Sequence, residues 1–208
     1  MSICNGVYFD TGDKMFEAET SYYLQFQINS ALISIDYITN CVYDTNSIFK
    51  SKAEYYHYYL DHLLYSIGQI ANRFKPVNNK TKNAEAINER VIANCKNYHF
   101  SESKYPILSN KLYRNTVEHI DEYNVGTIIN HKGVGGFNYI DDDTDTDLID
   151  FLRKDKSKHI YTLDLIVGEV YIQREETELR LNIASLKNEL EELKVSVECL
   201  FEYATILY

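Results

Sequence analysis

Apolar residues recur every three or four positions along two long stretches near the start of this chain. In the first stretch, Met15 to Val42, the repeating residues are Leu24, Ile28, Ala31, Ile35, Ile38 and Val42. In the second, Ser51 to Phe74, they are Tyr56, Leu60, Leu63, Leu64, Ile67 and Ile70. This spacing places the side chains on one face of an α-helix. The pattern therefore predicts two long amphipathic helices.

Local signals set the ends of these helices and predict two more. The segment Ser51-Lys-Ala-Glu54 has the capping-box pattern that opens a helix, and Pro76 follows the end of the second stretch. A third, shorter helix is predicted over Ala84 to Asn97. A fourth, from Ser109 to Asn124, is followed closely by Gly126. Helices of this number and size are typical of a bundle with one core.

The character of the chain changes after Gly126. The acidic run Asp141 to Asp147 suggests a calcium loop, but the sixth and twelfth positions counted from Asp143 lack the Gly and Glu of an EF-hand. We expect a solvated acidic turn that caps a short helix, Leu148 to Arg153. The stretches His159 to Asp164 and Glu169 to Gln173 alternate around Gly168 and predict a β-hairpin.

The last predicted element is a helix from about Glu175 to Tyr203. Its apolar residues follow a 4-3 spacing: Leu179, Ile183, Leu186, Leu190, Leu193, Val197 and Leu200. This spacing is the seam of a coiled coil, and Glu189 with Lys194 fits the charge pairing between two parallel chains. The same seam could instead pack on the protein's own hairpin or bundle. The sequence leaves both alternatives open.

The predicted fold is mainly α, a bundle of four to five helices with a small β-hairpin and a long C-terminal helix. We expect residues 1–125 to form the bundle, and 126–208 to add an acidic loop, the hairpin and the last helix, packed on the bundle or on a dimer partner. Four scattered cysteines without a C-x2-C pair are typical of reduced thiols. With no apolar run that could span a membrane and no secretory leader, we expect a cytoplasmic protein.

Charge is unevenly distributed along the chain. The net charge is −10, which disfavours constitutive binding to nucleic acid. From Arg73 to Arg114, however, nine Lys/Arg stand against three acids, whereas after Thr116 acids outnumber bases. The segment could attract phosphates, and the predicted RNA-binding residues are Arg73, Lys75, Lys80, Lys82 and Lys111. Lysines that merely solvate helix faces are the alternative.

The positive segment ends at Arg114-Asn115-Thr116-Val117-Glu118-His119 in the fourth predicted helix. Residues four apart form one row on a helix, so Lys111, Asn115 and His119 align, with Arg114 beside them. A permanent cation and an imidazole that titrates near neutrality are suited to a phosphodiester. Asn115 is a poor helix former, which suggests a role other than propensity. Alternatively, Arg114 forms an ordinary surface pair with Glu118.

Arg114, a polar residue, three further positions and His119 resemble the R-x4-H motif of HEPN domains (higher eukaryotes and prokaryotes nucleotide-binding). The resemblance covers roughly residues 15–125. It implies a HEPN-like bundle and a metal-independent endoribonuclease without cofactors, in which two copies of the motif face each other across a homodimer. Arg114 and His119 would be catalytic, and Asn115 would position one of them. The products would be a 2′,3′-cyclic phosphate and a 5′-hydroxyl.

The resemblance also implies a biological role as a toxin or anti-phage effector, with RNA as substrate and an antitoxin or regulatory protein as a further partner. HEPN toxins paired with a nucleotidyltransferase antitoxin carry Tyr two residues after the His, where this chain has Asp121. Modification by such an antitoxin is therefore in doubt, although Tyr123 lies one turn beyond His119. The acid near His119 is expected to raise the pKa of the imidazole.

Two other interpretations remain open. The chain could be a non-catalytic helical module that binds a protein partner or a nucleotide through a dimeric bundle. It could also hold a metal between His57 and His62, with Asp61 between them. The five-residue spacing does not align two His on one helix face, and no further ligands are evident, so we expect no metal site.

Overall fold

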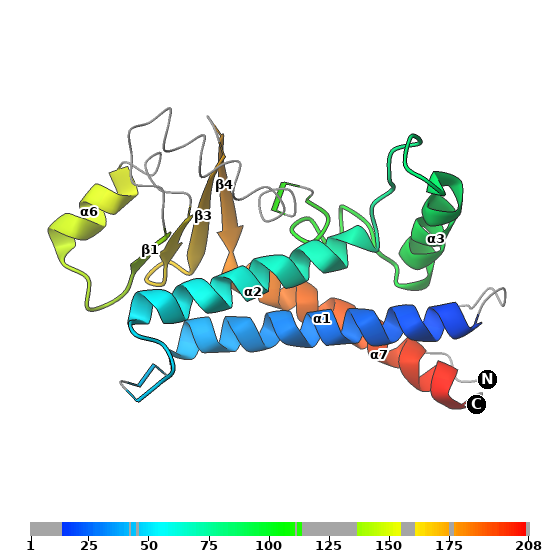
Figure 1. Cartoon of the computed structure of the whole chain (residues 1–208), viewed down its shortest axis with the longest axis horizontal. Coiled ribbons are helices and arrows are strands. Elements are labelled where there is room, and N and C mark those ends of the chain that lie inside the picture. The colour runs from blue at the N-terminus through cyan, green and yellow to red at the C-terminus, as the bar shows by residue number, and fades with distance from the viewer. Residues whose placement is uncertain are drawn as a thin grey trace.

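The computed structural model describes residues 14–41, 43–44, 46–110, 112–113, 137–154, 161–174 and 177–206. Three long helices, α1 (Lys14–Asn40), α2 (Lys52–Asn72) and α7 (Ile183–Ile206), form the centre of the molecule. As Figure 1 shows, α1 and α2 lie side by side and antiparallel, and α7 crosses behind them. The first two match the sequence prediction within two residues at each end.

Helix α2 begins where the capping box predicts. The Ser51 hydroxyl accepts a hydrogen bond from the Glu54 backbone N–H at 3.1 Å, and the Glu54 carboxylate accepts one from the Lys50 backbone N–H at 2.6 Å. Such bonds satisfy N–H groups that lack a partner inside the helix. Helix α3 (Ala84–Asn97), also at its predicted position, is tied to the end of α2, because the Asn94 amide donates to the Arg73 carbonyl at 2.9 Å.

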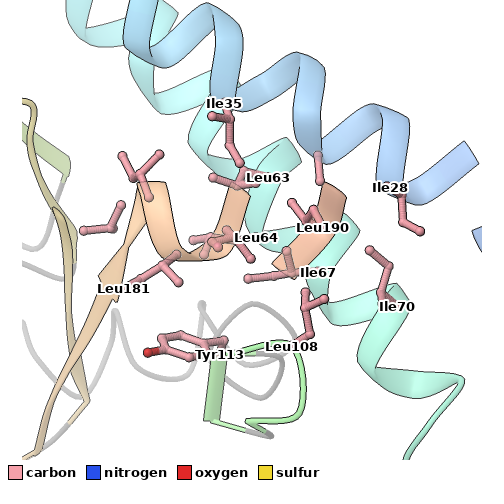
Figure 2. Close-up of a cluster of buried hydrophobic side chains, with 14 of the residues drawn as sticks. Ile28, Ile35, Leu63, Leu64, Ile67, Ile70, Leu108, Tyr113, Leu181 and Leu190 are labelled. Atoms are coloured by element: carbon pink, nitrogen blue, oxygen red, sulfur yellow. The ribbon is translucent and has the colours of Figure 1, made fainter. Parts of the chain in front are cut away.

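One hydrophobic core joins the three long helices. The predicted apolar rows of α1, from Leu24 to Ile38, and of α2 are buried, and Figure 2 shows Ile35, Leu63, Leu64, Ile67 and Leu190 pointing toward one another. The same cluster continues into the sheet through Leu181. Burial of apolar surface from all three helices and the sheet is the main stabilising contribution to this fold.

A small mixed sheet stands beside the N-terminal half of α2. Its strands are, in spatial order, β1 (Phe137–Ile140), β2 (Tyr161–Asp164), β3 (Glu169–Arg174) and β4 (Thr177–Asn182). The predicted hairpin is confirmed as β2 and β3, with Gly168 at φ +68° in the turn, a conformation that favours glycine. Strands β1 and β4 were not predicted, so the element is a four-stranded sheet and not a lone hairpin.

The unpredicted strand β1 runs parallel to β2, and helix α6 (Thr146–Lys154) connects them. The acidic turn between β1 and α6 caps this helix, since the Asp145 carboxylate accepts from the Asp147 N–H at 2.9 Å. It is also tied to α2, because the Lys52 ammonium lies 3.2 Å from Asp141 and 2.7 Å from Asp143. The predicted cap is confirmed, but the turn is salt-bridged to a lysine and not simply solvated.

The prediction of one helix from Glu175 to Tyr203 was wrong at its start. Residues Thr177–Asn182 form β4, paired antiparallel with β3, and the helix begins only at Ile183. Leu179 satisfies both the 4-3 spacing of the seam and an alternation with Leu181, so the local pattern was ambiguous. Pairing with β3 decides in favour of a strand. The Asn182 carboxamide then caps α7 by accepting from the Ser185 N–H at 2.9 Å.

The seam of α7 packs inside the molecule. Its apolar residues from Ile183 to Leu200 are at most 3% exposed within a single chain. Helix α7 packs on α1, and its seam contributes to the core described above. A parallel coiled coil between two chains needs the same seam at a partner's surface. Of the two alternatives left open by the sequence, packing on the protein's own bundle is the one observed.

Candidate functional site

The predicted catalytic residues Arg114, Asn115 and His119 lie outside the described residues, as does Lys111. The structure does describe the segment that leads into them, from Ser101 to Asn110, together with Leu112 and Tyr113. We name residues 106–113 the motif approach. Its contacts with α7, β4 and α2 decide where the predicted motif begins.

Asn110 starts a helical turn at the end of the motif approach. The Asn110 side-chain carbonyl accepts a hydrogen bond from the Leu112 N–H at 3.0 Å, and Leu112 and Tyr113 are helical. Asn is among the preferred residues for capping a helix N-terminus in this way. The observed start differs from the predicted start, Ser109, by only a residue or two.

A buried carboxylate from α7 holds the motif approach. The Glu189 oxygens accept hydrogen bonds from the Ile107 N–H at 3.0 and 3.1 Å and from the Leu108 N–H at 3.0 Å. Glu189 is only 8% exposed, and burial raises the pKa of its carboxyl group, whereas these hydrogen bonds lower it. The predicted pairing with Lys194 is wrong, since Lys194 lies 3.7 Å from Glu198 in the same helix.

Tyr113 fixes the other end of the motif approach. Its hydroxyl donates to the Arg180 carbonyl of β4, and burial raises the pKa of the phenol. In Figure 2, Leu108 and Tyr113 lie near Ile67, Ile70 and Leu190, with α1 on the opposite side of the cluster. The predicted motif therefore begins on the side of the α2–α7 layer that faces away from α1.

A pocket of about 410 Å³ opens beside the motif approach. It is lined by Lys75, Glu102, Pro106, Ser109 and Asn110. The Lys75 ammonium donates to the Glu102 carboxylate at 2.6 Å, and the Glu102 side chain is 80% exposed. A phosphate that enters this pocket meets one cation, but it has to displace an exposed carboxylate from it.

The structure brings together only part of the predicted RNA-binding set. Lys75 lines the pocket, whereas the Arg73 guanidinium lies 4.2 Å from the Tyr23 ring centroid in a cation–π contact with α1. Lys80 and Lys82 are exposed in the connection between α2 and α3 and do not line the pocket. Of the four described residues of the predicted RNA-binding set, Lys75 is the one that lines this pocket.

The alternative metal site on α2 finds no support in its geometry. His57 Nε2 lies 3.4 Å from the Asp61 carboxylate, but His62 Nδ1 lies 2.9 Å from the Tyr58 carbonyl oxygen. The His62 ring therefore contacts its own helix. Among the residues that the structure describes, no three His, Cys, Asp or Glu side chains are grouped to bind a metal ion.

Sequence reasoning missed two features of the surface and core. Glu189 was interpreted as a partner of Lys194 in charge pairing between two parallel chains, and nothing in the sequence marks it as buried. The second feature is a row of exposed apolar residues on the outer side of α1: Tyr22, Phe26, Ile33 and Tyr37. The sequence does indicate this second row, because its residues also recur at helical spacing. The prediction considered only the longer apolar row of α1, which forms the core.

Comparisons of the chain with protein-family models, with curated proteins and with solved structures found no match. Within the part of the chain that the structure describes, no helix has the length and apolar character needed to cross a bilayer. The residues of this chain, and the resemblance of Arg114 and His119 to the R-x4-H motif, therefore provide the basis for a proposed function.

Proposed function

We propose that this chain is a metal-independent endoribonuclease of the HEPN type, with Arg114, Asn115 and His119 as its catalytic residues. The observation that carries the proposal is the pocket beside the motif approach, where Lys75 stands next to the capped start of the predicted motif helix. Once the RNA backbone displaces the Glu102 carboxylate, which lies 2.6 Å from the Lys75 ammonium, this lysine offers a positive charge beside the start of the predicted motif.

Cleavage without a metal requires two proton transfers. One group removes the proton of the 2′-hydroxyl, whose oxygen attacks the adjacent phosphorus, and a second group protonates the departing 5′-oxygen. His119 from each of two chains supplies these groups. Arg114 neutralises the charge that develops on the phosphoryl oxygens. The products are a 2′,3′-cyclic phosphate and a 5′-hydroxyl, and no oxidant or water is consumed.

The proposal includes a composite site that two copies of the motif form at a homodimer interface. A role as a toxin or anti-phage effector, regulated by an antitoxin or another protein, follows from the same resemblance. The anchoring of the motif approach supports a fixed site, because Glu189 and Tyr113 hold its two ends against the core. Catalytic groups act best on a rigid support.

RNA cleavage in the presence of EDTA tests the proposal. Wild-type protein should convert a structured RNA pool to fragments whose new 5′ ends are hydroxyls. His119→Ala and Arg114→Ala should each lose activity by at least about 100-fold, the usual contribution of a general acid or base. His62→Ala is the matched control, since this exposed histidine lies on α2 and contacts its own helix. Equal cleavage by wild type and His119→Ala would reject the assignment.

A second variant tests the pocket. Lys75→Gln removes a charge from the pocket and leaves the predicted motif intact, so it should raise the KM for RNA and leave kcat little changed. Lys96→Gln, at an exposed lysine of α3 outside the pocket and outside the predicted RNA-binding set, is its control. Equal effects of the two substitutions would indicate general attraction of RNA and not a defined pocket.

A non-catalytic helical module that binds a protein partner or a nucleotide is the second candidate function. The exposed apolar row on α1 favours protein binding, because a row of aromatic side chains on a helix is a common recognition surface. Absence of cleavage by wild-type protein, together with retained RNA or partner binding, would select this candidate.

A further inference from the structure

Helix α1 is apolar on two opposite faces. Its inner face, which includes Ile28 and Ile35, is buried in the core. On the outer face the exposed fractions are 64% for Tyr22, 59% for Phe26, 53% for Ile33 and 39% for Tyr37. With 3.6 residues per turn, these side chains fall within an arc of about 60°. We name these four residues the α1 stripe.

The neighbouring helix extends the stripe into a broader aromatic patch. Tyr58 of α2 is 45% exposed and contacts the Tyr59 ring, with the two centroids 5.2 Å apart. The two helices are joined at this surface, because the Tyr37 and Tyr59 rings stack with centroids 4.5 Å apart. These five large side chains, each about half exposed, hold on the order of 500 Å² of surface. That is as large as the largest apolar patch of a typical monomer.

The four residues of the α1 stripe are uncharged, although the exposed Glu19, three residues before Tyr22, lies on the same face of the helix. No Lys or Arg occurs from Met15 to Phe49. Two acids near the patch are already paired, Asp36 with Lys187 at 3.0 Å and Asp61 with His57 at 3.4 Å. Such a surface does not attract a polyanion such as RNA. It also does not repel a copy of itself, as a surface of one charge would.

The spacing along the α1 stripe is the same in both directions. Tyr22, Phe26, Ile33 and Tyr37 are separated by four, seven and four residues. If two α1 helices cross antiparallel around a two-fold axis between Asn29 and Ser30, Tyr22 meets Tyr37 of the partner copy, and Phe26 meets Ile33 of the partner copy. Asn29 and Ser30 are small, half-buried residues that allow close approach at the crossing.

We propose that the α1 stripe is the interface of a homodimer in which two α1 helices pack antiparallel about this axis. A two-fold interface must be self-complementary, and the palindromic, uncharged stripe meets that condition. Its four side chains supply about half of the roughly 800 Å² per partner of a standard interface, and the polar residues that flank them on α1 would supply the rest.

This inference does not rest on the proposed RNA cleavage. The motif approach packs on the side of the α2–α7 layer that faces away from α1. A dimer through the α1 stripe therefore does not bring the two motif approaches together. A composite catalytic site would need a second contact between chains, and loss of the α1 dimer would be separable from loss of cleavage.

Light scattering on the full-length chain tests the dimer. Wild-type protein at micromolar concentration should have at least twice the chain mass of 24.3 kDa. Phe26→Glu and Ile33→Lys each place a charge in the interface and should halve the mass of the assembly while the chain stays folded, because both sites are exposed in a single chain. Ile92→Glu, at a residue of α3 that is 69% exposed, is the matched control and should remain dimeric.

Mixing the two variants tests the antiparallel arrangement. In a mixed dimer, Glu at position 26 of one chain meets Lys at position 33 of the other, while the second contact keeps its native Phe and Ile. The mixture should therefore recover the dimer mass. A parallel arrangement offers no such pairing, so failure to recover the dimer would overturn the antiparallel packing. A monomeric wild type, or variants that keep the wild-type mass, would overturn the interface itself.

Discussion

Helices α7 and α1 both carry apolar residues at coiled-coil spacing, but they use them differently. The seam of α7 is buried inside the chain, and its other face carries polar residues such as Ser185, Asn188 and Glu191. Helix α1 buries one apolar face in the same core and exposes a second at Phe26 and Ile33. Helix α7, whose sequence most resembles a coiled coil, buries its apolar seam inside the chain, whereas α1 leaves a second apolar face exposed.

The difference teaches that spacing identifies an apolar face but not the surface that covers it. Each helix of a three-helix core needs one apolar face, and the α7 seam meets that need. A second apolar face on the same helix has no core left to enter. It is therefore the better indication of contact with another molecule.

The largest effect is expected from truncation of the α7 seam. Leu190 is fully buried among α1, α2 and α7. Leu190→Ala should lower the free energy of unfolding by about 2–5 kcal/mol, because it removes apolar contacts and leaves a cavity. Chemical denaturation measures the loss. A change below about 0.5 kcal/mol, the range of surface substitutions, would contradict internal packing of the seam.

A smaller loss of stability is expected from a substitution of Glu189, the buried carboxylate of α7. Glu189→Gln replaces one carboxylate oxygen by an NH2 group. One oxygen could still accept from both N–H groups of the motif approach, but the NH2 group would then face the Ile107 N–H, and both hydrogen bonds would lose the charge of their acceptor. The free energy of unfolding should fall by about 1–3 kcal/mol. Glu192→Gln, an exposed neighbour, is the control and should change little.

The pH dependence of stability sharpens this prediction. Burial raises the pKa of Glu189, so its carboxyl group binds a proton more tightly in the folded state than in the unfolded chain. The contribution of Glu189 to the free energy of unfolding should be most favourable below the ordinary Glu pKa and should decline as pH rises through the raised pKa. Denaturation measured across this range should show that decline in wild type and a shallower one in Glu189→Gln. Identical slopes would contradict the assignment.

A much smaller effect on the isolated chain is expected from truncation of the α1 stripe. Ile33→Ala should change the stability of the monomer by less than about 0.5 kcal/mol, since the side chain is half exposed. It should weaken the proposed dimer by about tenfold, because two-fold symmetry applies the loss twice. Analytical ultracentrifugation measures the dissociation constant. An unchanged constant would remove Ile33 from the interface.

The smallest effect is expected at the charged flank of α7. The Lys194 ammonium lies 3.7 Å from a Glu198 carboxylate oxygen, and both side chains are partly exposed. Lys194→Ala should cost less than about 0.5 kcal/mol and leave the oligomeric state unchanged. If α7 formed an intermolecular zipper, removal of its flanking charge would weaken the dimer. Thermal unfolding combined with light scattering distinguishes the two.

Much of the helical framework could be predicted from the sequence. The bounds of α1, α2 and α3 followed from apolar periodicity and from the Ser51 capping box, both of which act over one or two turns. The turn at Gly168 and the cap at Asp145 were local in the same sense. The start of the candidate site at Asn110 was also predicted to within a residue or two.

Other parts depended on contacts between distant residues. Strand β4 was predicted as helix because Leu179 fits both periods, and only pairing with β3 decides. Strand β1 forms because β2 lies beside it. Glu189 is buried because the motif approach, more than eighty positions away along the chain, offers two backbone N–H groups. No local pattern records such a partner.

The sequence by itself determined the helices α1, α2 and α3 with the residues at which they begin, and the hairpin of β2 and β3. The tertiary structure decided that the α7 seam faces inward, that Lys75 lines the pocket beside the motif approach while Arg73 does not, and that the α1 stripe stays exposed. The physical reason is one of range. Periodicity and capping depend on neighbours within a turn or two, whereas burial depends on which distant surfaces meet.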